Sequence, residues 1–195
     1  MNGFITSPER LLYQKIKFQE ELTASLAEKA LEEGWIVSDK IYTVTLPEFE
    51  DIEKEFGEKR QLDFMVNDAE TRYAALVRDI IAEAPDRLVK LFSQAFAFGQ
   101  RHLLPSDIDP LGAFQEFENT FLNGMPEDRV DKLVFHSEKI AIWEQTKEVH
   151  AAYWIEAGND SEIYYRLRNC VMDGMLSSTP LQTLMREGKF MIAYR

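Results

Sequence analysis

The sequence predicts an α+β fold that is predominantly α-helical, with about seven or eight helices and a small antiparallel sheet formed mainly from the N-terminal third. Apolar residues recur at helical spacing through most of the 195 residues. Only nine Gly and seven Pro interrupt the chain, a density of turn residues that favours long helices. The β-branched and aromatic runs that favour strands are concentrated between residues 35 and 66.

The first element is predicted as a helix over roughly residues 8–33. Ser7 is a favoured N-cap residue, and Pro8 suits the first helical position because an amide hydrogen is not needed there. Leucine, isoleucine and alanine then recur on one face of the helix. Gly34 is a typical residue for ending it.

Three short strands are predicted after this helix, over residues 35–37, 41–45 and 61–66. The first two are rich in β-branched residues and are separated by a turn at residues 38–40. In the third, leucine, phenylalanine and valine alternate with other residues. We expect the second and third strands to pair in the antiparallel sheet.

A short amphipathic helix is predicted between these strands, and it is strongly acidic. Thr45 and Glu48 have the spacing of a capping box, which marks the beginning of a helix. Residues 46–58 contain a single basic residue, Lys54. The acidic residues in the same range are Glu48, Glu50, Asp51, Glu53, Glu55 and Glu58.

The middle of the chain is predicted to be helical. A second capping box begins a helix over roughly residues 67–84, and Asp86 begins another that extends toward residue 103. A loop bounded by prolines follows at residues 105–110. The next helix carries three phenylalanines at helical spacing and ends near Asn123.

The last third is predicted to be helical as well, except at its end. The longest predicted helix begins at Pro126 and extends toward Ala157. Ser161 begins a further helix, and Thr179 begins a short one. Residues 190–194 have the composition of a strand that adds to the sheet.

No internal repeat, low-complexity tract or linker divides the sequence. We therefore expect residues 1–195 to form a single compact domain. The loop at 105–110 is the alternative boundary between two smaller domains.

The charge balance excludes several classes of partner. The chain has 34 acidic and 22 basic residues and a net charge of −12. Such a surface repels phosphate backbones and anionic lipids, so neither direct nucleic-acid binding nor membrane binding is expected. The sequence has neither an apolar run long enough to span a membrane nor the pattern of a signal peptide, and a cytoplasmic location is expected.

Motifs for catalysis and for cofactor binding are absent from the sequence. It has no His-Glu-x-x-His zinc motif, no Gly-x-Ser-x-Gly nucleophile motif and no glycine-rich phosphate loop. No cofactor is predicted, and a non-enzymatic function is favoured. The single cysteine, Cys170, lies on an apolar helix face and is predicted to be a core residue. His150, in an apolar stretch, is predicted to be a partly buried residue of the core or of its rim.

The acidic helix is the segment whose composition departs most from that of an ordinary surface. A row of carboxylates on one helix can imitate a phosphate backbone or neutralise a basic surface. We therefore expect an acidic interaction protein, an inhibitor or immunity-type factor, whose partner is a basic and itself nucleic-acid-binding protein. The predicted partner-binding residues are Glu48, Glu50, Asp51, Glu53 and Glu55.

The alternative hypothesis is a metal-dependent enzyme or small-ligand binder near His102, Asp107 and Asp109. Two carboxylates two residues apart in a loop can hold a divalent cation together with a phosphate. The simpler interpretation is that Asp109 caps the helix beginning at Pro110 and that Asp107 is solvated. A homo-oligomer is a third possibility, because the phenylalanines at 114–121 suit either a core or a dimer face.

Overall fold

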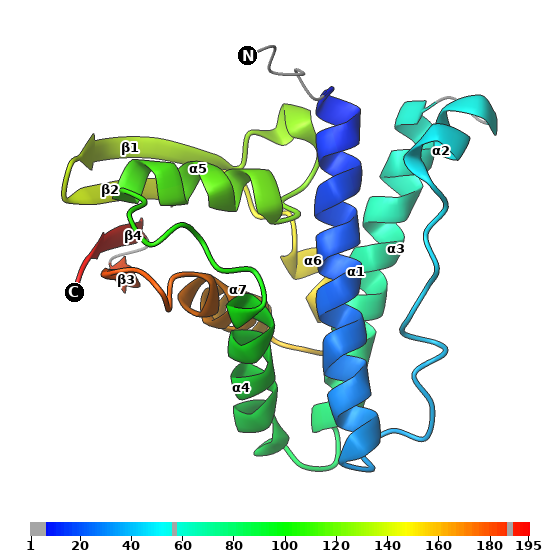
Figure 1. Ribbon diagram of the computed structural model, residues 1–195. Coiled ribbons are helices and arrows are strands. Elements are labelled where there is room, and N and C mark those ends of the chain that lie inside the picture. Colours follow the sequence, from blue (N-terminus) through cyan, green and yellow to red (C-terminus); the bar gives the residue numbers. More distant parts are fainter. Residues whose placement is uncertain (1–6, 56–57, 187–188) are drawn as a thin grey trace.

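The computed structural model describes residues 7–55, 58–186 and 189–195, and it confirms an α+β fold that is mainly helical (Figure 1). Along the chain the helices and strands are α1 (Pro8–Glu32), α2 (Phe49–Glu55), α3 (Glu58–Ile81), α4 (Arg87–Gln100), α5 (Pro110–Thr120), the 3-10 helix η1 (Pro126–Asp128), β1 (Asp131–Ser137), β2 (Ile140–Gln145), α6 (Ala151–Glu156), α7 (Glu162–Met175), β3 (Leu181–Arg186) and β4 (Lys189–Tyr194).

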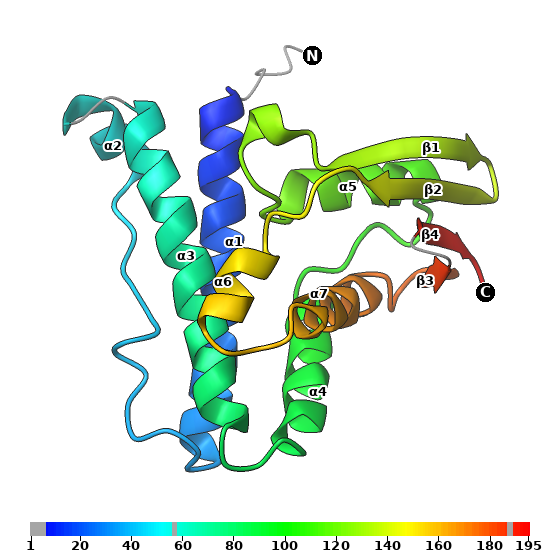
Figure 2. The same cartoon turned by 180° about the vertical axis from the view of Figure 1, so that it is seen from behind.

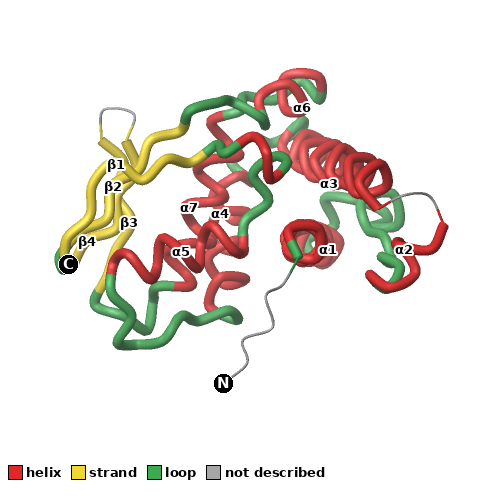
Figure 3. Tube along the Cα trace, turned by 90° about the horizontal axis from the view of Figure 1, so that it is seen from above, coloured by secondary structure: helices red, strands yellow, loops and turns green. Residues whose placement is uncertain are grey.

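The elements form layers that are clearest from above (Figure 3). The sheet lies on one side, α4, α5 and α7 occupy the middle, and α1, α3 and α2 form the other side. Helix α5 packs on the sheet against β1, β2 and β4. Helix α6 lies against α3, as the view from behind shows (Figure 2). The segment that connects α1 to α2 runs back along α3 (Figure 1).

Helix α1 follows the predicted range closely. The Ser7 hydroxyl accepts a hydrogen bond from the Arg10 amide at 3.2 Å, and Pro8 stands at the beginning of the helix. The buried face carries Ile16 and Leu26, which are fully inaccessible to solvent. This face packs against α3. Because the buried residues of α1 recur at helical spacing, their pattern in the sequence was sufficient to predict the helix.

The predicted strand at 61–66 is wrong, because these residues belong to α3. Leu62 and Val66 are both buried, which an alternating strand would also predict. They are four residues apart, however, and therefore lie on one face of a helix as well. Phe64, the middle residue of the apparent alternation, is 66% exposed. The helical interpretation holds because Met65 and Ala69 extend the buried face along the helix.

The predicted strands at 35–37 and 41–45 are also wrong, because residues 35–48 form turns and irregular chain. Two side chains, Ile36 and Tyr42, anchor this segment in the core. The Tyr42 hydroxyl donates a hydrogen bond to Asp79 on α3 at 2.6 Å. The segment is held by these two side chains, whereas Val37, Ile41 and Val44 beside them are exposed.

The sheet is C-terminal rather than N-terminal, with the strand order β1-β2-β4-β3 and antiparallel pairing throughout. The predicted helix from Pro126 to Ala157 is instead η1, the β1–β2 hairpin and the short α6. In β2, Ala141 and Trp143 are buried while their neighbours are less so, the two-residue period of a strand. The predicted helix after Thr179 is β3, and the predicted strand at the end is β4.

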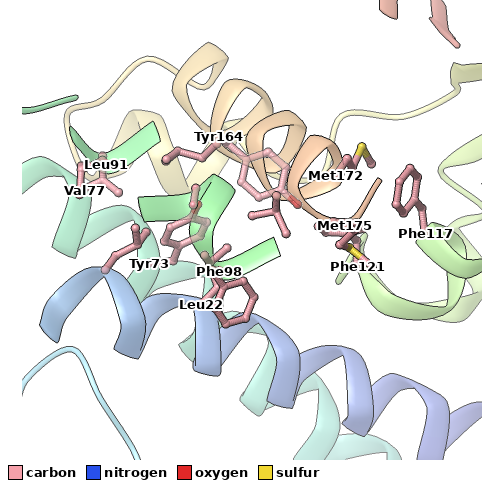
Figure 4. Packing of buried hydrophobic residues seen from close by; sticks show 14 of the residues in the cluster. Leu22, Tyr73, Val77, Leu91, Phe98, Phe117, Phe121, Tyr164, Met172 and Met175 are labelled. Carbon is pink, nitrogen blue, oxygen red and sulfur yellow. The ribbon is translucent and has the colours of Figure 1, made fainter. Parts of the chain in front are cut away.

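Aromatic residues from distant parts of the chain fill the main core (Figure 4). The cluster includes Tyr73 from α3, Phe98 from α4, Phe117 from α5 and Tyr164 from α7. Phe117 belongs to the run of phenylalanines that the sequence left open between a core and a dimer face, and all three of them are buried: Phe114, Phe117 and Phe121. This run therefore serves the core.

Helices α4 and α7 cross at very close range. Gly99 on α4 faces Gly174 on α7, and neither position has space for a side chain. A Cβ at Gly99 would lie 2.1 Å from the Val171 carbonyl oxygen, and one at Gly174 would lie 2.2 Å from the Phe96 carbonyl oxygen. The two backbones are therefore in direct contact, which fixes α7 relative to the rest of the helices.

Among the described residues, none of the helices combines the length and the apolar character that a membrane crossing requires.

Candidate functional site

The predicted acidic segment lies on the outside of the molecule, on α2 and just before it. Glu48, Glu50 and Asp51 are exposed. Glu50 accepts a hydrogen bond from the Arg10 guanidinium on α1 at 2.6 Å. Glu53 and Glu55 belong to the same helix, but their side chains are outside the described part of the structure. The structure thus keeps Glu48, Glu50 and Asp51 accessible, and Glu50 also joins α2 to α1.

The three residues of the alternative metal hypothesis have separate environments. Asp109 caps α5, because its Oδ1 accepts a hydrogen bond from the Gly112 amide at 2.6 Å. His102 packs edge-on against Phe18 with 5.0 Å between ring centroids, and burial lowers its pKa. Asp107 is exposed. Among the described residues, no three His, Cys, Asp or Glu side chains are grouped closely enough to hold a metal ion.

A different set of polar residues meets inside the molecule, and the sequence did not predict it. It forms a chain of side-chain contacts from α1 and α3 through the segment after α5 to β1 and α7. Its members are Gln19, Glu70, His150, Asn123, Asp131 and Arg168. We call this set the buried polar chain.

His150 is the centre of the buried polar chain and is fully buried. Its Nδ1 lies 3.1 Å from Glu70 Oε1, and its Nε2 lies 3.2 Å from Asn123 Oδ1. The orientation of the Asn123 amide is fixed, because its nitrogen donates to Asp131 Oδ2 at 2.8 Å. Both ring nitrogens therefore face oxygen acceptors. The ring stacks on Tyr164 with 3.7 Å between centroids.

At the end of the buried polar chain opposite Gln19, Asp131 and Arg168 form a buried ion pair. Arg168 Nη2 donates to Asp131 Oδ2 at 3.0 Å, and the two side chains are 8% and 1% exposed. The Asp131 carboxylate also raises the pKa of Glu118 on α5. Among the described residues, Asp131 Oδ1 and Arg168 Nε are buried without a hydrogen-bond partner. Buried polar atoms without partners are costly, so this ion pair is incompletely satisfied within the described part of the protein.

The segment 123–130 covers the buried polar chain and separates two hollows. The first, which we call the Lys15 hollow, encloses about 240 Å³ and lies between α1, α5 and this segment. The second, the Glu70 hollow, encloses about 270 Å³ on the α3 side. Gly124 and Met125 line both hollows, so they form the wall between them.

Two titratable side chains of opposite type line the Lys15 hollow. Burial, together with the nearby Asp131 carboxylate, raises the pKa of Glu118 to about 7. Burial also lowers the pKa of Lys15, an effect that the charge of Glu118 partly offsets. Near neutral pH, Glu118 can therefore either donate or accept a proton, as a general acid or base must.

The backbone of the covering segment is unusual at its far end. Arg129 has φ = 46° and is the one non-glycine residue with positive φ among those described. This conformation is costly for a residue with a side chain, and strained residues of this kind are concentrated at functional sites. Arg129 lines the Lys15 hollow, where its exposed guanidinium adds a positive charge to that of Lys15.

Sequence reasoning identified one member of this site in part. His150 was predicted to be a partly buried residue of the core or of its rim, and in the structure it is fully buried. Glu70, Asn123 and Asp131 stand at positions that resemble ordinary surface positions in the sequence. A signal was present at Gln19 and Arg168, since both are polar residues on the apolar face of a helix. Cys170 is only partly buried, and burial raises its pKa.

Comparisons with protein-family models, with curated proteins and with solved structures found no match for this chain.

Proposed function

We propose that this protein binds a small organic carboxylate in the Lys15 hollow and that Glu118 shares a proton with the bound carboxylate. One observation carries the proposal: Lys15 from α1 and Glu118 from α5 line a single hollow, with the buried Asp131–Arg168 pair behind it. Concave sites with a few convergent polar groups and shifted pKa values are typical of ligand binding.

The walls of the hollow match such a ligand in charge and polarity. Lys15 and Arg129 supply two positive charges in a protein whose net charge is −12. A protonated Glu118 donates a hydrogen bond to a carboxylate, which an ionised one cannot do. The remaining lining includes Leu11, Leu12 and Val130, which suit a short hydrocarbon chain. A volume of about 240 Å³ is below the roughly 300–1,000 Å³ of sites for larger ligands, so the ligand is small.

Butyrate is the probe for this proposal, followed by NMR titration at constant ionic strength. We expect saturable shifts of the amides at residues 123–130. Affinity should fall about tenfold between pH 6 and pH 8, because Glu118 ionises through its pKa of about 7 and then repels the anion. Glu118→Gln should retain binding but lose this pH dependence. Lys15→Met should weaken binding by about tenfold, the effect of one charged contact.

The chain offers matched controls for both substitutions. Lys17→Met on α1 and Glu116→Gln on α5 change exposed residues of the same type and should bind butyrate like the unmodified protein. Butanol should not bind, and inorganic phosphate in place of butyrate tests whether any anion suffices. If neither butyrate nor phosphate binds saturably, or if the control variants lose as much affinity as the site variants, the proposal is wrong.

We also propose that the acidic segment binds the basic surface of a partner protein in the cytoplasm, as an inhibitor or immunity-type factor would. The observation that favours this second function is the exposure of Glu48, Glu50 and Asp51 on the outside of the molecule. Complementary charge accelerates association and selects among partners, and its effect weakens as salt increases.

Charge reversal tests the second function. We expect replacement of Glu48, Glu50, Asp51, Glu53 and Glu55 by lysine to abolish co-purification of a basic partner from host extract while the circular dichroism spectrum stays unchanged. The control reverses five exposed acidic residues elsewhere: Glu21, Glu28, Glu83, Glu138 and Glu156. A partner that is retained by the segment variant, or lost equally from the control, would show that binding does not use this segment.

A further inference from the structure

We infer that the Glu70 hollow is a second binding site and that it takes an alkylammonium group, a primary amine on a short aliphatic stem. This site lies on the opposite side of the segment 123–130 from the Lys15 hollow and requires a ligand of opposite charge. The inference therefore does not depend on the carboxylate site.

The charges that line the hollow favour a cation. Three carboxylates contribute to its wall, those of Asp63, Glu70 and Asp128. Lys147 pairs with Asp128 from outside the lining at 3.2 Å, and His150 Nδ1 lies 3.1 Å from Glu70. Asp63 has no ion-pair partner among the described residues. The lining therefore has more carboxylates than paired cations, and its negative charge favours an ammonium group.

The buried carboxylate of Glu70 gives an independent reason to place a cation in this hollow. Its side chain is only 2% exposed, and its Oε1 already accepts a hydrogen bond from Gln19 at 3.1 Å and contacts His150. Its Oε2 is buried and has no hydrogen-bond partner among the described residues. A buried carboxylate oxygen without a donor is costly. An ammonium in the hollow that Glu70 lines brings both the charge and the donors that this oxygen lacks.

The rest of the lining selects an organic cation over a metal ion. Val66, Val149 and Met125 give the hollow apolar walls, and the Tyr153 ring adds an aromatic one. Such walls suit an aliphatic stem, and an aromatic face attracts an ammonium group. The carboxylates are not grouped closely enough to hold a metal ion in the described part of the chain. About 270 Å³ is sufficient for a short alkylamine or for the end of a lysine side chain.

The hollow also has a fixed polar rim that can orient the ligand. The Tyr153 hydroxyl donates a hydrogen bond to Asn67 Oδ1, so that amide has its NH₂ group directed to the Asp63 carbonyl. Asp128 is held by the Met125 amide at 2.9 Å as well as by Lys147. These contacts fix the surroundings of the site before any ligand arrives, which lowers the entropic cost of binding.

Butylammonium is the probe, titrated into the full chain and followed by the NMR signals of Val66, Val149 and Tyr153. We expect saturable shifts at these three residues. Glu70→Gln should reduce affinity by at least tenfold, and Asp63→Asn should reduce it several-fold. Glu83→Gln changes an exposed carboxylate of the same charge beyond α3 and should bind like the unmodified protein. Butanol, the neutral probe of similar shape, should cause no saturable shifts.

Several results would overturn this inference. Equal binding of butanol would show an apolar hollow without charge recognition. Displacement of butylammonium by Mg²⁺ with shifts at the same residues would assign the site to a metal ion. Unchanged affinity in Asp63→Asn would also contradict it, and this variant keeps the test decisive if Glu70→Gln fails to fold, because Asp63 is outside the buried polar chain.

Discussion

Replacing Gly99 or Gly174 with alanine is expected to destabilise the protein by at least about 2 kcal/mol, and replacing both is expected to prevent folding. At each position the new methyl carbon would lie 2.1–2.2 Å from a carbonyl oxygen of the other helix. These contacts are with backbone atoms, which no side-chain rotation can relieve. The helices α4 and α7 must therefore move apart and open the aromatic core around them.

The intrinsic preference of alanine for helices opposes this effect only weakly. Alanine stabilises a helix interior by about 0.5–1 kcal/mol relative to glycine. Overpacking of a close contact costs about 1–3 kcal/mol and occasionally more, and a contact with rigid backbone belongs to the upper end. The steric cost therefore exceeds the helical gain at both positions.

Urea unfolding monitored by circular dichroism measures this change. Ser93→Ala, at an exposed position of α4, is the control and should alter the free energy of unfolding by less than about 0.5 kcal/mol. If Gly99→Ala or Gly174→Ala proves as stable as this control, the close crossing of α4 and α7 is not a feature of the folded protein.

Replacing Arg168 with leucine should cost about 3–5 kcal/mol of folding free energy. The substitution leaves the Asp131 carboxylate buried with no cation, since its side chain is only 1% exposed and Arg168 is its ion-pair partner. The substitution also removes the contact between the Arg168 guanidinium and the Phe121 ring, whose centroid lies 5.3 Å from it. Most of the cost comes from the Asp131 charge, which is left buried without a partner (a stranded charge), because removing one member of a buried ion pair destabilises a protein more than removing both.

The pH dependence of the Arg168→Leu variant gives a second readout. The charge of Arg168 lowers the pKa of Glu118, which burial raises from 4.5 to about 7. An acid whose pKa is raised on folding contributes stability at low pH and loses it as the pH rises from its unfolded to its folded pKa. Without Arg168 this pKa rises further, so the variant should be least stable, relative to the unmodified protein, at pH 8 rather than at pH 5.

The neighbouring arginine of α7 provides the control. Arg166 is exposed and its guanidinium lies over the Phe92 ring, so Arg166→Leu should change stability by less than about 1 kcal/mol. Adding Asp131→Asn to Arg168→Leu should recover part of the lost stability, because the stranded charge is then removed. A double variant that is less stable than Arg168→Leu alone would contradict the stranded-charge explanation.

The elements that the sequence predicted well are those with local signals. Ser7 and Asp109 are capping residues whose side chains bond the backbone three residues later, so the beginnings of α1 and α5 could be located without tertiary information. Residues 61–66 and 131–145 have no such signal. Their apolar spacing fits both a helix and a strand, and the choice depends on the packing partner, which single-sequence periodicity does not contain.

The candidate site was harder to predict than the fold because its members are far apart in the sequence. Lys15 and Glu118 reach one hollow from α1 and α5, which are separated in the sequence by three other helices, and the hydrogen bond between Gln19 and Glu70 spans 51 residues. Each residue taken alone is a common polar residue on a helix. Only their burial and convergence distinguish them, and both arise from tertiary structure.

The position of β4 between β2 and β3 has a consequence for synthesis. On the ribosome, the nascent chain can bring α1 and α3 together early, since both are complete by residue 81. Strand β2 can pair with β4 only after residues 189–194 have emerged from the ribosome. The stacking of Trp143 on Phe190 also forms only then. During that interval the β1–β2 hairpin has an open inner edge, so this half of the molecule is the part that most needs protection from aggregation before translation is finished.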